Sequence, residues 1–304
     1  MQLYLPIAEM SVNLFLIVGI GGLIGFMSGL FGVGGGFLLT PALIFTGVPP
    51  AVAVGTGANE LVATSISGAI AHWRRGNVDF AMGGVLLTGG AVGSLGGTWL
   101  FGVLKGIGQI ELTIGVSYVV LLGTVGGLMF QESARQLLKA RTGSPQPRTK
   151  LHEHRWFHGL PLKLRFRRSK LYISALLPFG LGTGIGFLAA MMGVGGGFIL
   201  VPAMIYLLGM PTQLVIGTSL FQVTFVTGFS AYLHALNNQS VDIVLALLLL
   251  AGGVVGAQFG ARLGANLSGV QLRFMLSVIV LALAVKLAFG LFAEPDAPYL
   301  VTRG

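Results

Sequence analysis

One segment of this chain occurs twice, and the second copy lies 161 residues after the first. Three consecutive glycines, Gly34 to Gly36, are followed by Pro41, and Gly195 to Gly197 are followed by Pro202 in the same way. The correspondence continues at an offset of 162, where Gly55-Thr56 matches Gly217-Thr218. Duplicated apolar segments with Gly and Pro interruptions at corresponding places are typical of secondary transporters whose site lies between two repeats.

The composition predicts an integral membrane protein. Of 304 residues, 54% are hydrophobic and 9% are charged, whereas soluble domains carry about 25% charged residues. Apolar stretches long enough to cross about 30 Å of hydrocarbon recur from Leu14 to Leu291. The first stretch has no basic residue ahead of it, which indicates a retained membrane segment and not a signal peptide. The net charge of +9 does not indicate nucleic acid, because most of it lies in one loop.

Each repeat is expected to contain five membrane segments, so the predicted fold class is all-α with roughly ten segments. They are expected at 12–31, 34–47, 51–73, 80–103 and 109–130, and again at 172–192, 195–208, 213–236, 243–263 and 270–292. The second of each set has about 14 residues, or roughly 21 Å of helix, which is too short to cross alone. We therefore expect a half-helix there, packed in protein or lining a cavity.

These segments divide the chain into four parts: repeat 1 at 1–130, a linker at 131–170, repeat 2 at 171–292 and a tail at 293–304. Residues 132–170 hold 11 of the 18 Lys and Arg residues, so the linker is expected to be cytoplasmic. An odd number of crossings per repeat puts Arg262 and Arg273 on the cytoplasmic side, the side of the linker. The repeats are then inverted in the plasma membrane, with both termini external. An even number would put these two charges outside.

The triple glycines have two interpretations. They are not nucleotide loops, because Phe37 and Phe198 stand where a phosphate or dinucleotide motif needs other residues. Close helix packing is one interpretation, and it suffices for Gly93-xxx-Gly97 and Gly256-xxx-Gly260. The second is a turn that starts a half-helix whose free N–H groups bind an anion. On this view Gly34, Gly35, Gly36, Gly195, Gly196 and Gly197 form two converging elbows, and Pro41 and Pro202 act at the hinges.

Polar side chains gather in the third segment of each repeat, where they are candidates for substrate binding. They are Thr56, Asn59 and Glu60 in the first repeat, and Thr218, Ser219 and Gln222 in the second. Their spacing puts Thr56, Asn59 and Glu60 on one helical face. Hydroxyls and amides can donate hydrogen bonds to an oxyanion, but the hydroxyls could also bond to their own helix.

Glu60 differs from its repeat mate Gln222 in being ionisable. A carboxyl group removed from water favours its neutral form and can therefore carry a proton. We hypothesise that Glu60 couples transport to protons. The alternative is that it is a protonated or hydrogen-bonded strut.

The linker has further interpretations besides that of a topological anchor. The basic run from Arg165 to Lys170 could hold anionic lipid head groups. His152, Glu153, His154 and His158 could bind a metal, but no matching ligand appears elsewhere, and we predict neither a metal nor another cofactor. The oligomeric state is open, a dimer included.

The doubled Gly-x-Gly-Gly-Gly-(x)4-Pro, each followed by Gly-Thr, resembles the sulfite exporter TauE/SafE family of membrane permeases. The resemblance covers both repeats. It implies a carrier, with export as its direction, for small sulfur-containing anions such as sulfite, sulfonates or sulfoacetate. With no nucleotide motif in the chain, we expect a gradient or a separate partner to drive it.

Three alternatives stay open. They are an anion channel with a dipole-lined pore, a membrane-embedded enzyme, and a scaffold subunit whose glycines only pack helices. An enzyme is not predicted, since no nucleophile with its base and orienting group appears.

Overall fold

The computed structural model describes residues 2–31, 34–141, 162–264 and 269–292. Two successive units of the chain have the same order of elements. The first unit contains β1 (Gln2–Leu5), β2 (Met10–Asn13), α1 (Leu14–Phe31), α2 (Gly36–Phe45), α3 (Pro50–Arg74), α4 (Phe80–Gly106) and α5 (Ile110–Arg141). The second contains β3 (Lys163–Phe166), β4 (Leu171–Ser174), α6 (Leu176–Met192), α7 (Gly197–Tyr206), α8 (Thr212–Leu233) with the π-helical turn η2 (His234–Asn238), α9 (Ile243–Gly264) and α10 (Gly269–Phe292).

The prediction of an all-α membrane protein is confirmed. Every expected segment contains one helix, and six helices of the described residues are long and apolar enough to cross a membrane. Helices α2 and α7 have 10 residues each, as expected for half-helices. Helix α3 has 25 residues but is not among the six.

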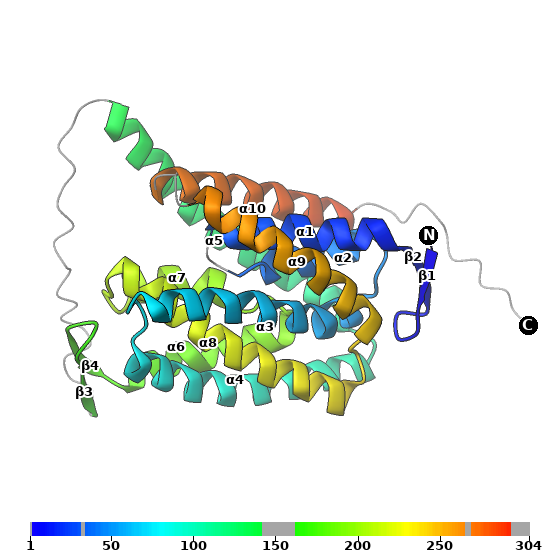
Figure 1. The fold of residues 1–304 in the computed structure, drawn as a ribbon. Coiled ribbons are helices and arrows are strands. Elements are labelled where there is room, and N and C mark those ends of the chain that lie inside the picture. Colours follow the sequence, from blue (N-terminus) through cyan, green and yellow to red (C-terminus); the bar gives the residue numbers. More distant parts are fainter. Residues whose placement is uncertain (1, 32–33, 142–161, 265–268, 293–304) are drawn as a thin grey trace, which may run out of the picture.

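The hairpins β1–β2 and β3–β4 were not predicted. They lie at opposite ends of the helical bundle (Figure 1). Residues 131–141, assigned to the linker from the sequence, continue α5, and residues 163–174 form the second hairpin. The residues between His152 and His158 that could have bound a metal lie outside the described residues.

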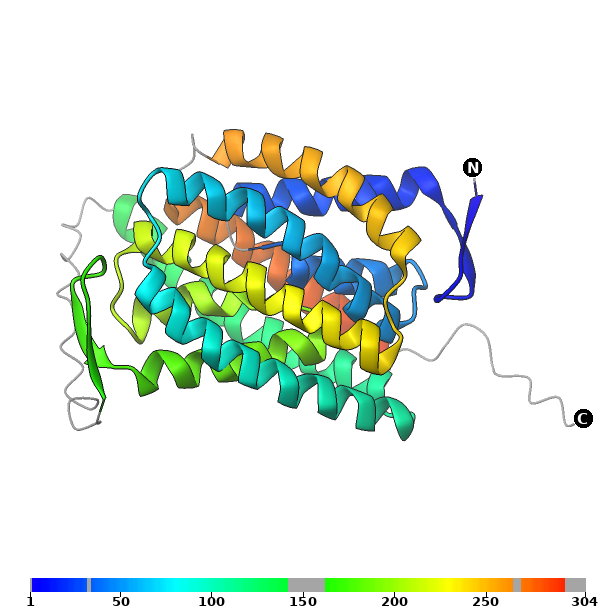
Figure 2. The ribbon, with the colours of Figure 1, turned by 60° about the horizontal axis from the view of Figure 1, so that its bottom comes forward.

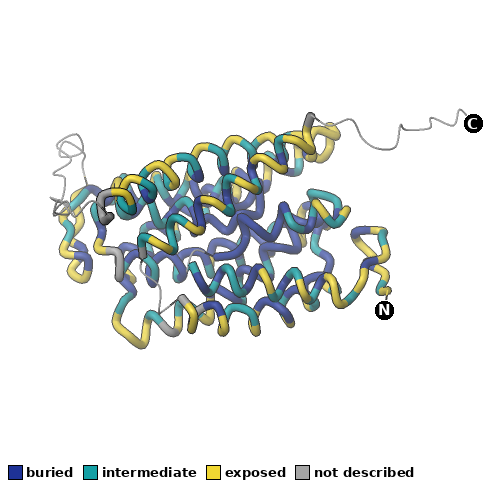
Figure 3. The backbone as a smooth tube through the Cα atoms, turned by 90° about the horizontal axis from the view of Figure 1, so that it is seen from above, coloured by how far each residue is buried: buried dark blue, intermediate teal, exposed yellow. Residues whose placement is uncertain are grey.

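The two units are interlocked through their first and fourth helices. Helix α1 packs along α9, and α4 packs along α6 (Figures 1 and 2). Glycines permit this approach, because a Cβ atom at Gly93 would overlap the carbonyl oxygen of Thr183, and one at Gly256 would overlap that of Gly22. The packing interpretation of the two Gly-xxx-Gly motifs is therefore confirmed. Buried backbone is concentrated in the middle of the bundle (Figure 3).

Helices α3 and α8, which carry the polar residues, pack against each other in opposite directions. A Cβ atom at Gly68 would lie 2.8 Å from Leu220, whereas one at Gly228 would lie 3.6 Å from Val62. Residue numbers therefore rise along α3 as they fall along α8. Corresponding positions near the starts of the two helices consequently lie at opposite ends of the bundle.

Asp79 and Asp242 fix the starts of α4 and α9. The Asp79 carboxylate accepts hydrogen bonds from the N–H groups of Ala81 and Met82, at 3.1 and 3.2 Å, which caps α4. The N–H of Ser169, at the tip of hairpin β3–β4, donates to the other Asp79 oxygen at 3.0 Å.

The first hairpin makes the corresponding contact with Asp242. The N–H of Ile7 donates to the Asp242 carboxylate at 3.0 Å, and the same side chain accepts from the N–H of Leu245 in α9. Each hairpin is thus tied to the fourth helix of the other unit, at its own end of the bundle.

Candidate functional site

Two glycine elbows start the half-helices. The first helical hydrogen bonds of α2 run from the N–H groups of Leu38 and Leu39 to the carbonyl of Gly35, at 3.0 Å each. The amides of Gly36 and Phe37 therefore precede the first helical bond. Gly34 has a φ angle of +80°, a conformation that glycine adopts without steric cost.

The second elbow makes the equivalent first helical bonds at the start of α7, although the glycine before α7 has a positive φ angle and Gly35, before α2, has one of −79°. The N–H groups of Ile199 and Leu200 donate to the carbonyl of Gly196, at 3.1 and 2.8 Å. Gly195 and Gly196 have φ angles of +74° and +75°. The prediction that glycine turns start two half-helices is confirmed.

The two elbows meet at the centre of the molecule. Phe37 and Phe198, which are repeat mates, stack with ring centroids 4.7 Å apart. A Cβ atom at Gly36 would lie 2.6 Å from the carbonyl oxygen of Val194 in the other elbow. Leu61 of α3 packs against both Gly36 and Gly195. The sequence did not single out Leu61, since nothing marks one leucine on an apolar helix.

Pro41 and Pro202 lie inside α2 and α7. A proline has no N–H, so the carbonyl group four residues earlier loses its helical donor. In both half-helices that carbonyl belongs to the stacked phenylalanine, Phe37 or Phe198. The hinge function predicted for the two prolines stays a prediction.

Glu60 and Gln222 are buried polar side chains without hydrogen-bond partners. Both carboxyl oxygens of Glu60 and both amide atoms of Gln222 lack a partner among the described residues, and the residues are 0% and 1% exposed. Each side chain reaches a glycine of the other unit. A Cβ atom at Gly253 would lie 2.5 Å from Glu60 Oε1, and one at Gly90 would lie 2.9 Å from Gln222 Nε2. Buried polar groups are nearly always paired, so these two unpartnered side chains at corresponding positions are candidates for a functional site.

Two other candidate residues, one on α3 and one on α8, are already bonded. The Asn59 amide donates to the Gly55 carbonyl at 3.3 Å, and the Ser219 hydroxyl donates to the Ile216 carbonyl at 2.9 Å. In both bonds the side chain donates to a carbonyl of its own helix, which is the alternative to substrate binding that the sequence allowed. Ser230 of α8, which was not singled out, is buried with an unpartnered hydroxyl.

Thr56 and Thr218 join the two units at opposite ends of the bundle. The Thr56 hydroxyl accepts from the N–H of Asp242 at 2.9 Å, and the Thr218 hydroxyl accepts from the N–H of Asp79 at 3.0 Å. Asp242 lies at the end of the bundle that carries hairpin β1–β2, and Asp79 lies at the end that carries hairpin β3–β4. The two hydroxyls therefore do not meet around one small anion in this conformation.

A cavity of about 300 Å³ lies beside α7. It is bordered by α5, α10 and α8, reaches Phe198 at the elbow and is lined by Val201 and Pro202. Glu132 and Arg273 also line it, and the Tyr206 hydroxyl donates to a Glu132 oxygen at 2.5 Å. The α7 cavity thus connects charged groups with the elbow.

The α2 half-helix is more closely packed than α7. Thr40, the repeat mate of Val201, is 0% exposed, and Pro41 is buried, whereas Val201 and Pro202 are half-buried. At the end of α2, the Lys286 ammonium lies 4.2 Å from the ring centroid of Phe45. The half-helix of the second unit is therefore more accessible to solvent or ligand than that of the first.

The part of the chain that the structure describes contains no cluster of metal-binding side chains. Within it, no three His, Asp or Glu side chains are close enough to hold a metal ion.

The apolar helices and the two half-helices that meet at the centre define a membrane transporter. The family model for "Sulfite exporter TauE/SafE" matches residues 17–287, and the chain belongs to this family. It is 31% identical over 287 residues to a "Probable membrane transporter protein" of Xylella fastidiosa, covering 93% of this chain and 97% of that protein. It is 29% identical over 284 residues to the "Probable membrane transporter protein YjnA" of Bacillus subtilis, covering 91% and 100%. No solved structure gives a significant match.

Proposed function

We propose that this protein is a secondary transporter that exports small sulfur-containing anions, such as sulfite, sulfonates or sulfoacetate, across the plasma membrane. The observation that carries the proposal is the pair of unpartnered buried side chains, Glu60 and Gln222, at corresponding positions of the two units. The family's description as sulfite exporters supports the substrate class and the direction. The linker end of the bundle is the cytoplasmic end, because basic residues gather there.

The anion is bound by neutral donors in this proposal. The Gln222 amide has two N–H groups to donate, and the half-helix amides at Gly36 and Gly197 add the positive ends of two helix dipoles. Such donors can replace the water of an oxyanion without a buried cation. Sulfite and sulfonates present three oxygens that can accept hydrogen bonds from such donors.

Glu60 carries the proton in this mechanism. Its carboxyl group has no partner that would hold it in one protonation state. Its repeat mate cannot ionise, so only one unit binds the coupling ion. Gln222 then binds the anion and Glu60 binds the proton, so the two can be transported in the same direction or in opposite directions.

Thermal unfolding of the purified full-length protein with a panel of anions tests the substrate class. Sulfite, sulfoacetate and taurine are compared with phosphate and acetate. A ligand that binds only the folded form at a hundredfold excess over its Kd stabilises it by about 2.7 kcal/mol. We expect stabilisation by sulfite or a sulfonate, and its loss in Gln222→Leu. The variant should fold, because an unpaired buried amide is replaced by an apolar side chain.

Gln258→Leu is the matched control, since Gln258 is exposed on α9, and it should keep the shift. Equal stabilisation of wild type and Gln222→Leu would remove Gln222 from the site. Stabilisation by phosphate or acetate but by no sulfur anion would overturn the substrate class.

Cysteine accessibility tests alternating access, and the natural chain contains no Cys. We expect Val201→Cys to react with a membrane-impermeant maleimide added at the linker end. Thr40→Cys, at the corresponding position, should stay unreactive without substrate because Thr40 is 0% exposed. Sulfite with a pH gradient should slow the first reaction and start the second from the opposite side.

Simultaneous labelling of both positions from opposite sides, unaffected by sulfite, would favour a channel over a transporter. Labelling of Val201→Cys that no anion changes would leave the cavity intact and contradict the substrate class.

A further inference from the structure

The two hairpins are equivalent in position but opposite in charge. Residues 162–174 contain five Lys or Arg residues and no acid, whereas residues 1–13 contain no base and one acid, Glu9. Glu9 corresponds to Lys170, and the two share a left-handed backbone, with φ angles of 52° and 53°. The fold of the hairpin therefore does not require the cations, since the copy without cations forms the same turn.

The β3–β4 hairpin is held rigidly against the bundle. Phe166 and Ser169 are buried, and the Ser169 hydroxyl and N–H both bond to the Asp79 carboxylate. The Arg168 guanidinium donates to the carbonyls of Gly76 and Val78, at 3.2 and 3.0 Å. One of the five cations thus has a structural role, and the tip is fixed to the start of α4.

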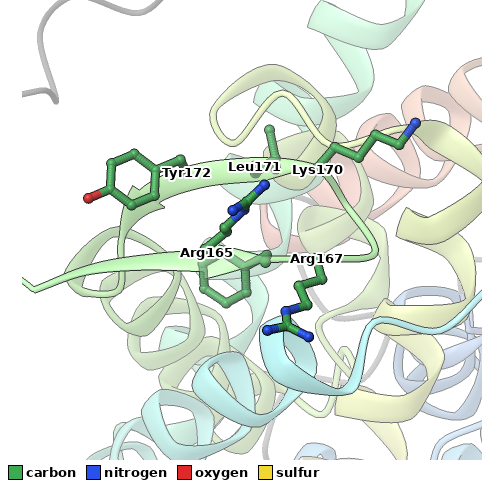
Figure 4. Close-up of a pocket in the computed structure, with 6 residues that line it drawn as sticks. Arg165, Arg167, Lys170, Leu171 and Tyr172 are labelled. Atoms are coloured by element: carbon green, nitrogen blue, oxygen red, sulfur yellow. The ribbon is translucent and has the colours of Figure 1, made fainter.

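Three of the other four cations border an open hollow. Arg165, Arg167 and Lys170 line it and are exposed, together with Tyr172 (Figure 4). The hollow has a volume of about 890 Å³. The hairpin thereby presents three cations for which the described part of the chain offers no bonding partner.

Apolar and aromatic side chains accompany these cations. Tyr172, the cross-strand partner of Arg165, is 63% exposed, and Leu164 is 46% exposed. Tyrosine and leucine beside basic residues form the composition of a protein surface at the membrane–water interface. The hairpin also lies at an end of the apolar bundle (Figure 1), where lipid head groups meet membrane-spanning helices.

We propose that the β3–β4 hairpin binds the phosphate head groups of acidic phospholipids in the leaflet at the linker end. Arg165, Arg167 and Lys170 contact the phosphates, and Tyr172 and Leu164 contact the acyl-chain boundary. Basic residues at the surface of an anionic membrane contribute about 1 kcal/mol each. We assign this surface to lipid and not to substrate, because none of the residues that line the hollow also lines the α7 cavity.

The test compares lipids with the full-length protein in nanodiscs of phosphatidylcholine, with and without phosphatidylglycerol, and uses no substrate. Phosphatidylglycerol should raise the Tm of the wild type. The triple variant Arg165→Gln/Arg167→Gln/Lys170→Gln should lose this shift, and its affinity for the acidic lipid should fall about a hundredfold. The variant should fold, because it keeps Phe166, Arg168 and Ser169.

Arg74→Gln/Arg75→Gln/Arg262→Gln is the control with the same loss of charge, and it should keep most of the shift. An undiminished phosphatidylglycerol shift in the hairpin variant would overturn the proposal. So would an equal shift of the wild type with inorganic phosphate or soluble glycerol phosphate, which would make the hairpin a site for free anions.

Discussion

Glu60→Gln abolishes proton-driven transport and leaves the protein folded. Proton binding requires an ionisable group, and the carboxyl of Glu60 is the buried, unpartnered acid of the candidate site. One pH unit is worth 1.36 kcal/mol per proton, or about a tenfold concentration ratio. Wild-type protein in proteoliposomes should therefore accumulate sulfite about tenfold against its gradient per pH unit if one proton is coupled, and the variant should not accumulate it.

The variant is expected to fold because it copies a group that the other unit already tolerates. Gln222 occupies the corresponding position beside Gly90, as Glu60 does beside Gly253. Exchange of labelled sulfite at equal pH should continue in Glu60→Gln, which separates coupling from binding. Glu111→Gln is the control, since Glu111 is exposed at the start of α5. Unchanged pH-driven accumulation in Glu60→Gln would contradict the role of this carboxyl.

Gly93→Ala destabilises the protein, whereas Gly84→Ala in the same helix does not. A Cβ atom at Gly93 would overlap the carbonyl oxygen of Thr183 and lie 2.7 Å from the N atom of Phe187. Both are backbone atoms of α6, so the two helices must separate. Overpacking of this kind costs about 1–3 kcal/mol, and we expect a loss near the upper end in thermal or denaturant unfolding in detergent.

Gly84 has nothing within 4 Å of such a Cβ atom. Gly84→Ala should therefore be neutral or gain up to about 1 kcal/mol from its higher helix propensity. Gly256→Ala should behave like Gly93→Ala, because its Cβ atom would overlap the Gly22 carbonyl in the equivalent α1–α9 contact. Equal unfolding free energies for Gly93→Ala and Gly84→Ala would show that α4 and α6 are not in close contact.

These predictions differ in how far the sequence alone supports them. The duplication at Gly34–Gly36 and Gly195–Gly197 was enough to predict two half-helices, because each of three consecutive glycines weakens a helix by about 1 kcal/mol relative to alanine. The role of Glu60 was also open to prediction, since a carboxylic acid in an apolar segment is costly. Its missing partner and its contact with Gly253 required the structure.

The positions of Thr56 and Thr218 show where sequence reasoning fails. Equivalent residues in two repeats suggest equivalent places in one site. In the structure α3 and α8 run in opposite directions, so equivalent residues near their starts are separated by the length of the bundle. Each hydroxyl instead accepts a backbone hydrogen bond from an aspartate of the other unit.

By itself, the sequence determined the local features of this protein: apolar helices, glycine turns, proline positions and small-residue packing faces. Each follows from backbone sterics or transfer from water, which act over a few neighbouring residues. Only the tertiary structure decided that α1 pairs with α9 and α4 with α6, and that short hairpins cap opposite ends. Apolar helices of similar composition can pack with several partners. Which helices pair depends on how the glycine-containing faces of helices from both units fit together in space.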